Sequence, residues 1–281
     1  MSNNVKILAG LIAATIIFLV VVLWPESAQV PEPTISEPVV EMVATSSQKT
    51  MGTSVEGRDI KVFSFGNGDT HLLFVGGVHG GYEWNSIILA EEFIAALQNE
   101  IVAVPQGVTI DVIPNLNPDG YAKHLDPVAN YTDAAKRFNA NGVDLNRNFD
   151  CRWQPTSTWR GNEVSAGTAA FSEPEAAALR DFVLETNPSA AIFWHSVANN
   201  VYGSECGNGV LPMTKTILET YARAASYGEV LVFDAYPVSG DAEGWLASIG
   251  IPAITVELET RDSSEWERNK KGIEAVLNLH R

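Results

Sequence analysis

The sequence predicts an α/β fold in which helices cover both faces of a mixed, mostly parallel central sheet. The first observation is that short runs of strand-forming residues alternate along the chain with stretches of helical length, a pattern typical of parallel sheets. The second is composition, because 281 residues that are 46% hydrophobic can build one large domain with its own core.

An uninterrupted apolar run precedes this domain at residues 7–24. At about 1.5 Å per residue, the run is just long enough to cross a bilayer core as a helix. A cleaved signal peptide is the alternative, but Glu26 makes the next segment a poor cleavage site. Lys6 precedes the run and no further positive charge follows until Lys49. This predicts an N-terminus in the cytoplasm and the remaining chain outside it.

Composition divides the chain into three parts. Residues 25–50 are rich in Pro, Ser and Glu and show no helical or strand period, which predicts a disordered tether. We therefore expect a membrane anchor at residues 1–24, the tether, and one folded domain at residues 51–281.

The chain is acidic, with 34 acidic against 18 basic residues and a formal net charge of −16. A surface of this sign repels phosphate backbones, so we expect no nucleic-acid partner. Solubility is the simpler explanation of the charge.

The strands and helices of the domain follow in order. Strands are expected where β-branched and aromatic residues lie between turn-forming residues, at residues 59–65, 71–75, 108–113, 190–194, 230–234 and 251–258. Helices are expected at residues 84–97, 172–186, 213–227, 244–249 and 265–280. The second of these begins with Ser172 as N-cap, Pro174 in its first turn and Glu175 three residues after the cap.

A turn and a long loop separate the third strand from the second helix. The turn is Asn117-Pro118-Asp119-Gly120, which ends the strand. Residues 121–168 are expected to be mostly irregular, and long loops in compact domains are usually functional.

Ionisable residues lie at the ends of three expected strands. His79 follows residues 71–75 within a Gly-rich corner, with Glu83 four residues further on, while His195 and Glu257 end two other strands. Active sites of such sheets gather at strand ends. Two histidines, one carboxylate and a separate carboxylate base are what a catalytic zinc site needs. The alternatives are a Gly-rich turn with an incidental His79 and a salt-bridged core Glu257.

Several motifs in one order resemble the zinc carboxypeptidase family, over roughly residues 71–260. They are His79…Glu83-Trp84, Asn117-Pro118-Asp119-Gly120, Gly142-Val143-Asp144-Leu145-Asn146-Arg147-Asn148, Phe171-Ser172-Glu173-Pro174-Glu175, His195-Ser196, Tyr236…Ser239-Gly240 and Val256-Glu257-Leu258. The family resemblance implies a carboxypeptidase-like α/β fold and one Zn²⁺ per chain.

The resemblance also implies roles at the metal. His79, Glu83 and His195 would hold the zinc, with a water in the fourth position. Asp144 would orient the ring of His79. Glu257 would take a proton from the attacking water and pass it to the leaving amine.

Further roles concern the substrate. Arg137 would stabilise the oxyanion. Asn146 and Arg147 would hold the free carboxylate of the substrate, and Tyr236 would close over it.

Two departures from the family pattern stand out. Three residues rather than two separate His79 from Glu83, which we interpret as one inserted residue absorbed by Gly80 and Gly81. The spacing from Arg137 to the Asp144 motif resembles bacterial members that trim cell-wall peptides.

Two cysteines and two acidic residues complete the candidates. Cys151 and Cys206 follow site motifs, and the domain is expected outside the cytoplasm, so a disulfide is expected rather than two free thiols. Asp241 or Glu243 would line the pocket for the terminal side chain and favour a basic or amino-bearing residue. A solvated acidic loop is the alternative there.

Our first functional hypothesis is a zinc-dependent metallocarboxypeptidase that hydrolyses the C-terminal peptide bond of peptides. The second is an amidase or endopeptidase that uses the same zinc chemistry on peptidoglycan stem peptides. An inactive binding domain on the same fold is the third. The expected partners are a peptide or peptidoglycan-peptide substrate and, through residues 7–24, a membrane.

Overall fold

The computed structural model describes residues 46–281. The expected membrane anchor and most of the expected tether lie outside these described residues. Within residues 46–281, no helix combines the length and the apolar character that crossing a membrane requires.

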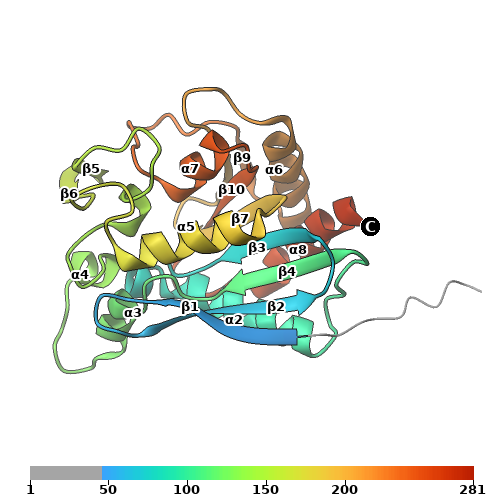
Figure 1. Ribbon diagram of the computed structural model, residues 1–281, viewed down its shortest axis with the longest axis horizontal. Helices are drawn as coiled ribbons and strands as arrows, with labels where there is room; N and C mark the ends of the chain where they lie inside the picture. Colours follow the sequence, from blue (N-terminus) through green and yellow to red (C-terminus); the bar gives the residue numbers. More distant parts are fainter. Residues whose placement is uncertain (1–45) are drawn as a thin grey trace, which may run out of the picture. The chain divides into compact units, whose positions relative to one another are not determined.

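An eight-stranded mixed sheet runs through the domain (Figure 1), in the order β1-β2-β4-β3-β7-β10-β8-β9. Its strands are β1 (Ser46–Thr53), β2 (Asp59–Gly66), β3 (Thr70–Val75), β4 (Val108–Ile113), β7 (Ala190–Ser196), β8 (Asn200–Gly203), β9 (Gly228–Val230) and β10 (Ala253–Leu258). The four central strands β4, β3, β7 and β10 are parallel neighbours. Strands β1, β2 and β8 join the sheet antiparallel.

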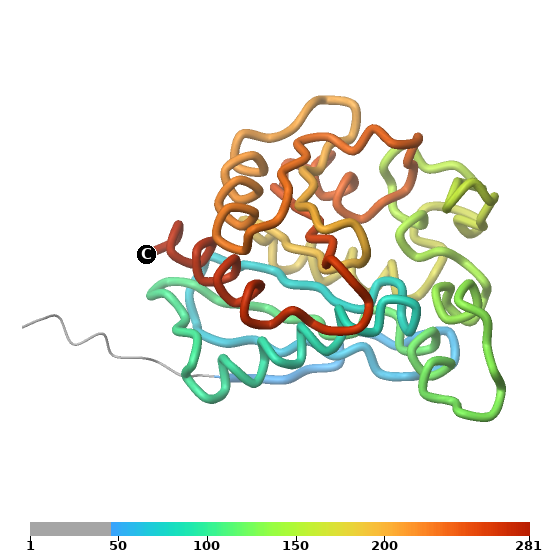
Figure 2. Tube along the Cα trace, turned by 180° about the vertical axis from the view of Figure 1, so that it is seen from behind, coloured from blue at the N-terminus to red at the C-terminus, as the bar shows by residue number. Residues whose placement is uncertain are grey.

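Helices cover both faces of this sheet, as Figures 1 and 2 show from opposite sides. Helices α2 (Trp84–Gln98), α6 (Pro212–Ala225) and α8 (Trp266–Leu277) pack on one face, and α5 (Pro174–Thr186) and α7 (Ala242–Ser248) on the other. Successive strand residues point to opposite faces, so Phe74 enters one hydrophobic core and Leu73 the other. The expected α/β fold with helices on both faces is confirmed.

The stretch between β4 and α5 is more regular than the sequence predicted. It holds α3 (Pro118–Leu125), α4 (Asp133–Arg137), the short 3₁₀ helix η2 (Leu145–Arg147) and a hairpin of β5 (Thr156–Trp159) and β6 (Asn162–Ser165). The prediction of a turn at residues 117–120 was wrong, because Asn117 caps α3 by accepting the Gly120 N–H at 2.9 Å. Pro118 opens the helix, where its missing N–H is not needed.

Three smaller expectations were also wrong, and one strand was missed. Strand β1 begins at Ser46, within the expected tether; as an exposed edge strand it shows no hydrophobic alternation. The strand expected at residues 230–234 is only the end of β9, and β8 was not expected. Ser172 does not cap α5: Glu173 is the N-cap residue, and the Ser172 hydroxyl donates to its carboxylate instead.

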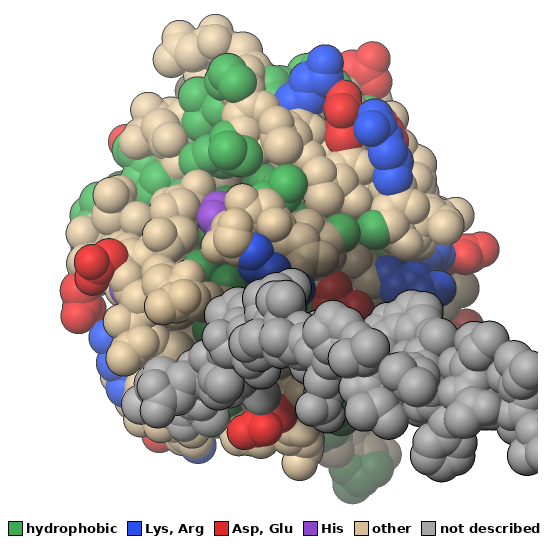
Figure 3. All heavy atoms as spheres, turned by 90° about the vertical axis from the view of Figure 1, so that its right-hand side faces the viewer, with side chains coloured by type: hydrophobic (Ala, Val, Ile, Leu, Met, Phe, Trp, Pro, Cys, Tyr) green, Lys and Arg blue, Asp and Glu red, His purple; other side chains and the backbone are tan. Residues whose placement is uncertain are grey.

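Charged side chains of both signs are scattered over the face of the molecule seen in Figure 3. Where this face is visible, acidic and basic side chains lie among hydrophobic and uncharged ones without gathering into a patch of one sign. A surface of this kind favours solubility.

Candidate metal centre and substrate cleft

A glycine-rich corner places His79 and Glu83 side by side. Between β3 and α2 the chain turns through the 3₁₀ helix η1 (Gly80–Glu83). Gly80 has a φ of +47°, and a Cβ there would lie 2.8 Å from the backbone of Gly120. Only glycine meets both conditions. The turn brings Glu83 Oε2 to 2.9 Å from His79 Nδ1, so the additional residue between them does not separate the two side chains.

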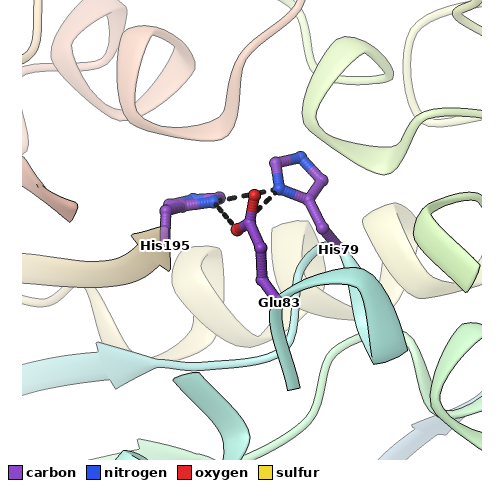
Figure 4. Close-up of side chains that lie close together, drawn as sticks. All are labelled: His79, Glu83 and His195. Atoms are coloured by element: carbon purple, nitrogen blue, oxygen red, sulfur yellow. Dashed lines mark hydrogen bonds and ion pairs between the residues drawn. The ribbon is translucent and has the colours of Figure 1, made fainter. Parts of the chain in front are cut away.

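His195 completes a triangle of donor atoms (Figure 4). It lies near the end of β7, and its Nδ1 is 3.0 Å from Glu83 Oε2 and 3.1 Å from His79 Nδ1. Ligand atoms of a tetrahedral zinc with bonds near 2.0 Å lie about 3.3 Å apart, so the spacing fits zinc to within a few tenths of an ångström. Among residues 46–281, these three form the one group of His, Cys, Asp or Glu residues that could hold a metal ion in this way.

Carboxylates face the outer nitrogen of both rings. His79 Nε2 lies 3.5 Å from Asp144 Oδ1, and His195 Nε2 lies 3.3 Å from Glu243 Oε1. Neither Nε2 makes a hydrogen bond within the described residues, so each carboxylate supplies a negative charge within ion-pair distance of its ring, while the opposite nitrogen faces the other ligand atoms. The contact from Glu243 was not expected from the sequence.

The electrostatics of the centre favour a bound cation. Burial alone would lower the pKa of His195, but its contacts with the acceptor carboxylates of Glu243 and Glu83 raise it to about 10. Burial would likewise raise the pKa of Glu83, but the charge of His79 and the contact with His195 lower it overall. The buried carboxylates therefore stabilise a positive charge at this point, which a proton or a metal ion can supply.

Glu257 lies beside the centre on the neighbouring strand. It is paired in register with His195 across β10 and β7. Its Oε2 is buried and has no hydrogen-bond partner. Burial, together with the charge of Glu83, raises the pKa of Glu257 to about 7. A carboxylate in this environment can accept and return a proton near neutral pH.

A cavity of about 770 Å³ opens over these residues. Arg147 forms part of its wall and is 4% exposed. Two of its N–H groups donate to the carbonyls of Asn146 and Thr158, while its Nε has no partner. Within the described residues, no carboxylate lies within ion-pair distance of Arg147. Its charge therefore remains available to a ligand.

Arg137 is held by the metal-site carboxylates. Its Nε and Nη2 each lie 2.9 Å from Asp144 Oδ2, and its Nη1 is 3.6 Å from Glu83. The guanidinium also stacks on Trp159, 4.8 Å from the ring centre. Arg137 lines the cavity in a fixed position.

The other expected substrate residues also line the cavity. Asn146 accepts the N–H of Ala242 at 2.9 Å, which ties it to the start of α7. Tyr236 lies on the loop after β9 and packs against Phe233. Asp241 caps α7 by accepting the Gly244 N–H at 2.7 Å.

The expected disulfide between Cys151 and Cys206 is confirmed. It joins the loop after η2 to the loop after β8. Both loops contribute to the cavity wall, through Arg152 and Glu205 respectively.

Four residues near the centre were missed by the sequence reasoning. Tyr82, Trp159 and Arg261 line the cavity, and the buried Asn85 holds the segment around Arg261. The available signal for Arg261 was its place three residues after the end of β10, the strand that carries Glu257. The residues that Arg261 contacts are distant from it in the sequence, so no spacing pattern identifies them.

Comparison with known proteins agrees with this geometry. The profile of the zinc carboxypeptidase family matches residues 44–276. A zinc carboxypeptidase A 1 from Anopheles gambiae is 29% identical over 241 residues, covering 76% of this chain and 55% of that protein. A gamma-D-glutamyl-L-diamino acid endopeptidase 1 from Lysinibacillus sphaericus is 26% identical over 239 residues, covering 74% of this chain and 59% of that protein. The chain thus spans less than two thirds of either relative.

Among solved structures, the murein-tripeptide amidase of Escherichia coli O157 has a similar fold. Its TM-score is 0.61 at 24% identity, covering 86% of this chain and 95% of that one. The matched range spans all three residues of the metal cluster together with Glu257 and Arg147. From this match, the chain belongs to the zinc carboxypeptidase family.

Proposed function

We propose that the protein is a zinc-dependent metallocarboxypeptidase that hydrolyses the C-terminal peptide bond of peptides. Arg147 is the observation that carries this proposal, because it is buried beside the metal cluster without a carboxylate partner among residues 46–281. An unpaired buried charge is costly. The free carboxylate of a peptide would pair with it through two parallel hydrogen bonds.

His79, Glu83 and His195 would hold the zinc. When bound there, zinc acidifies a water molecule and polarises the carbonyl of the substrate. Glu257 would take the proton of the attacking water and deliver it to the leaving amine. The unpaired Oε2 of Glu257 supports this role.

Three further residues would position the substrate. Arg137 would face the carbonyl oxygen as negative charge develops on it, and its contacts with Asp144 hold it in place. Asn146 would share the terminal carboxylate with Arg147. Tyr236 would close over that carboxylate from the loop after β9.

Two acidic residues of the cavity wall, Asp241 and Glu243, support a preference for a C-terminal residue with an amino or guanidino group. Both already contact protein groups, Gly244 for the first and Thr255 for the second. Both carboxylates would therefore contact the side chain of the substrate's C-terminal residue from fixed positions.

An amidase or endopeptidase acting on peptidoglycan stem peptides is the second candidate. The names of the Lysinibacillus endopeptidase and the Escherichia amidase place such activities among the relatives. In this chain, Arg160 and Arg261 favour it, because both line the cavity and neither lies within ion-pair distance of a carboxylate among residues 46–281. They suit a substrate that carries more than one carboxylate.

We propose that the domain lies outside the cytoplasm. The Cys151–Cys206 disulfide supports it, because such bonds persist in oxidising compartments. An anchor at residues 7–24 remains part of this proposal.

A substrate panel tests the function. Free peptides and muropeptides would be incubated with zinc-loaded protein, with and without a chelator. We expect release of the C-terminal residue, and we expect the chelator to abolish this release.

A variant tests the role of Glu257. Glu257→Gln should keep one zinc per chain and lose turnover. Full activity of that variant contradicts the mechanism, and less than one zinc per chain in zinc-replete protein favours the inactive binding domain.

A further inference from the structure

The turn that joins His79 to Glu83 has few bonds to the elements around it (Figure 4). Tyr82 donates its N–H to the His79 carbonyl at 3.1 Å, which is a bond inside the turn. Helices α3 and α4 pack against the turn, but among the described residues no backbone hydrogen bond joins residues 80–82 to either helix. The outer side of the turn therefore depends on packing.

Helix α3 crosses this turn at backbone distance. A Cβ on Gly81 would lie 2.2 Å from the Cβ of His124 and 2.9 Å from the Gly120 carbonyl oxygen. Real side chains do not approach so closely, so the contact requires glycine in the turn. His124, in the last turn of α3, is the side chain that occupies this contact.

The ring of His124 also stacks with two aromatic rings. The Trp84 ring lies 5.7 Å away at an interplanar angle of 12°, and the Tyr121 ring lies 6.0 Å away at 13°. Trp84 opens α2 directly after Glu83. His124 therefore contacts the chain on both sides of Glu83, at Gly81 before it and at Trp84 after it.

Packing is the only contact that the structure gives the His124 side chain. Its ring makes no hydrogen bond or ion pair among the described residues. Burial lowers the pKa of His124, and the charge of Lys136 lowers it further. The ring is therefore neutral at neutral pH, as a ring stacked between helices by packing should be.

The additional residue between His79 and Glu83 gives this contact its importance. A longer turn has more backbone conformations to lose when Glu83 takes up one fixed position. Surrounding side chains that hold a ligand in place supply that order before the metal binds. His124 is the side chain that touches both flanks of the ligand.

We propose that His124 is a positioning residue for Glu83, and that its stacked ring holds the lengthened turn so that the carboxylate meets both histidines. This inference rests on the proposed function only for the identity of the metal ligands. Ordinary packing at the end of α3 is the alternative. Packing of that kind would affect the stability of the fold and not the affinity for zinc.

Ring substitutions test the role of His124. Competition with a chromophoric chelator measures zinc affinity without turnover. His124→Ala should weaken zinc binding at least tenfold, within the range found when a residue supporting a metal ligand is lost. His124→Phe keeps a flat ring and should stay within threefold of wild type. His124→Leu keeps helix propensity but no flat ring, and should lose threefold to tenfold.

A core variant is the matched control for lost stability. Ile217 is fully buried in α6, which packs against α8. Ile217→Ala should lower the midpoint of denaturant unfolding and leave zinc affinity within twofold of wild type. The Leu variant at position 124 provides the same comparison with this control if the Ala variant does not fold.

A double-mutant cycle shows whether His124 acts through Glu83. Glu83→Ala protein retains the two histidine ligands and would bind zinc more weakly. In that background, His124→Ala should change zinc affinity less than twofold, because the ligand that it positions is gone. Cobalt(II)-loaded protein gives a second signal: the visible absorption bands should change in His124→Ala and remain as in wild type in His124→Phe and Ile217→Ala.

The outcomes separate this inference from the proposed function. Equal zinc affinity in wild type and in the Ala and Leu variants at position 124 overturns the positioning role. An equal loss with and without Glu83 also overturns it, because the effect would then not pass through that ligand. Wild-type protein that binds zinc but cleaves no peptide contradicts the proposed function and leaves the affinity comparison valid.

Discussion

The two histidine rings at the metal centre are positioned by nearby carboxylates as well as by the strands and turns that carry them. The rings of His79 and His195 each turn an outer nitrogen to a carboxylate, Asp144 for the first and Glu243 for the second. The Glu243 carboxylate also accepts the Thr255 hydroxyl at 2.9 Å. Glu243 therefore has a structural connection to the metal site as well as its proposed contact with the substrate.

Replacement of Glu243 tests that connection. We expect Glu243→Gln to weaken zinc binding about 10- to 100-fold, the usual effect of losing a carboxylate behind a histidine ligand. Competition with a chromophoric chelator measures the affinity. Glu257→Gln is the control, because Glu257 does not face the outer nitrogen of a histidine ligand. This variant should change the zinc affinity less than threefold. Equal zinc affinity in wild type and Glu243→Gln would show that the contact does not orient His195.

The pH dependence of hydrolysis reports on Glu257. Burial raises its pKa to about 7, and a bound cation nearby lowers the pKa from that value. Glu257 must be ionised to accept a proton, so kcat/KM should rise with pH and level off. We expect the midpoint of this rise at or below about pH 7. A midpoint clearly above pH 7 in a pH–rate profile would assign the rise in kcat/KM to the ionisation of another group.

Short elements between β4 and α5 build one side of the cleft. Helix α3 begins at Asn117, whose side chain caps the helix and also donates to the Arg137 carbonyl at 3.0 Å. One buried side chain thus connects the start of α3 to the end of α4. Helix α4 in turn delivers Arg137 to the metal-site carboxylates.

Two cap substitutions distinguish a buried connection from an ordinary cap. Asn117→Ala should reduce the free energy of unfolding by about 2–3 kcal/mol, because a cap is lost and the buried Arg137 carbonyl loses its donor. Thr132→Ala removes an exposed cap of α4 and should cost only about 1 kcal/mol. Denaturant unfolding measures both values, and equal losses would contradict the proposed connection.

The sheet order organises the whole molecule. Strands β3, β7 and β10 are adjacent and parallel, so their carboxyl ends bring His79, His195 and Glu257 to one edge. The disulfide closes a loop of 55 residues beside this edge. It connects two segments of the cavity wall that no strand pairing joins.

Removal of the disulfide should lower global stability. For a loop spanning 55 residues, the chain-entropy relation gives a loss of up to about 4 kcal/mol in the free energy of unfolding. The Cys151→Ser/Cys206→Ser double variant, compared with wild type by denaturant unfolding, measures it. Unchanged stability would mean that the bond adds nothing beyond the packing of the core.

Much of the fold and of the candidate site could be predicted from the sequence. The helix at residues 84–97 and the strand at 108–113 agree with α2 and β4 to within one residue, because each is a mostly apolar stretch that follows glycine in the sequence. The edge strand β1 and the three-residue β9 carry no such pattern and were missed or misplaced. Contacts such as that between Arg261 and Tyr82, 179 residues apart, leave no local signal.

The sequence by itself determined the fold class and the candidate site residues, because strand and helix periods are local and site motifs stand at strand ends. Only the tertiary structure decided which of these residues meet. It showed that Glu83 contacts both histidines despite the additional residue, since Gly80 turns with a positive φ against Gly120. It also placed Glu243 behind His195 and left Arg261 without an acidic partner among the described residues. Which side chains face one another depends on the packing of strands and loops that lie far apart in the chain.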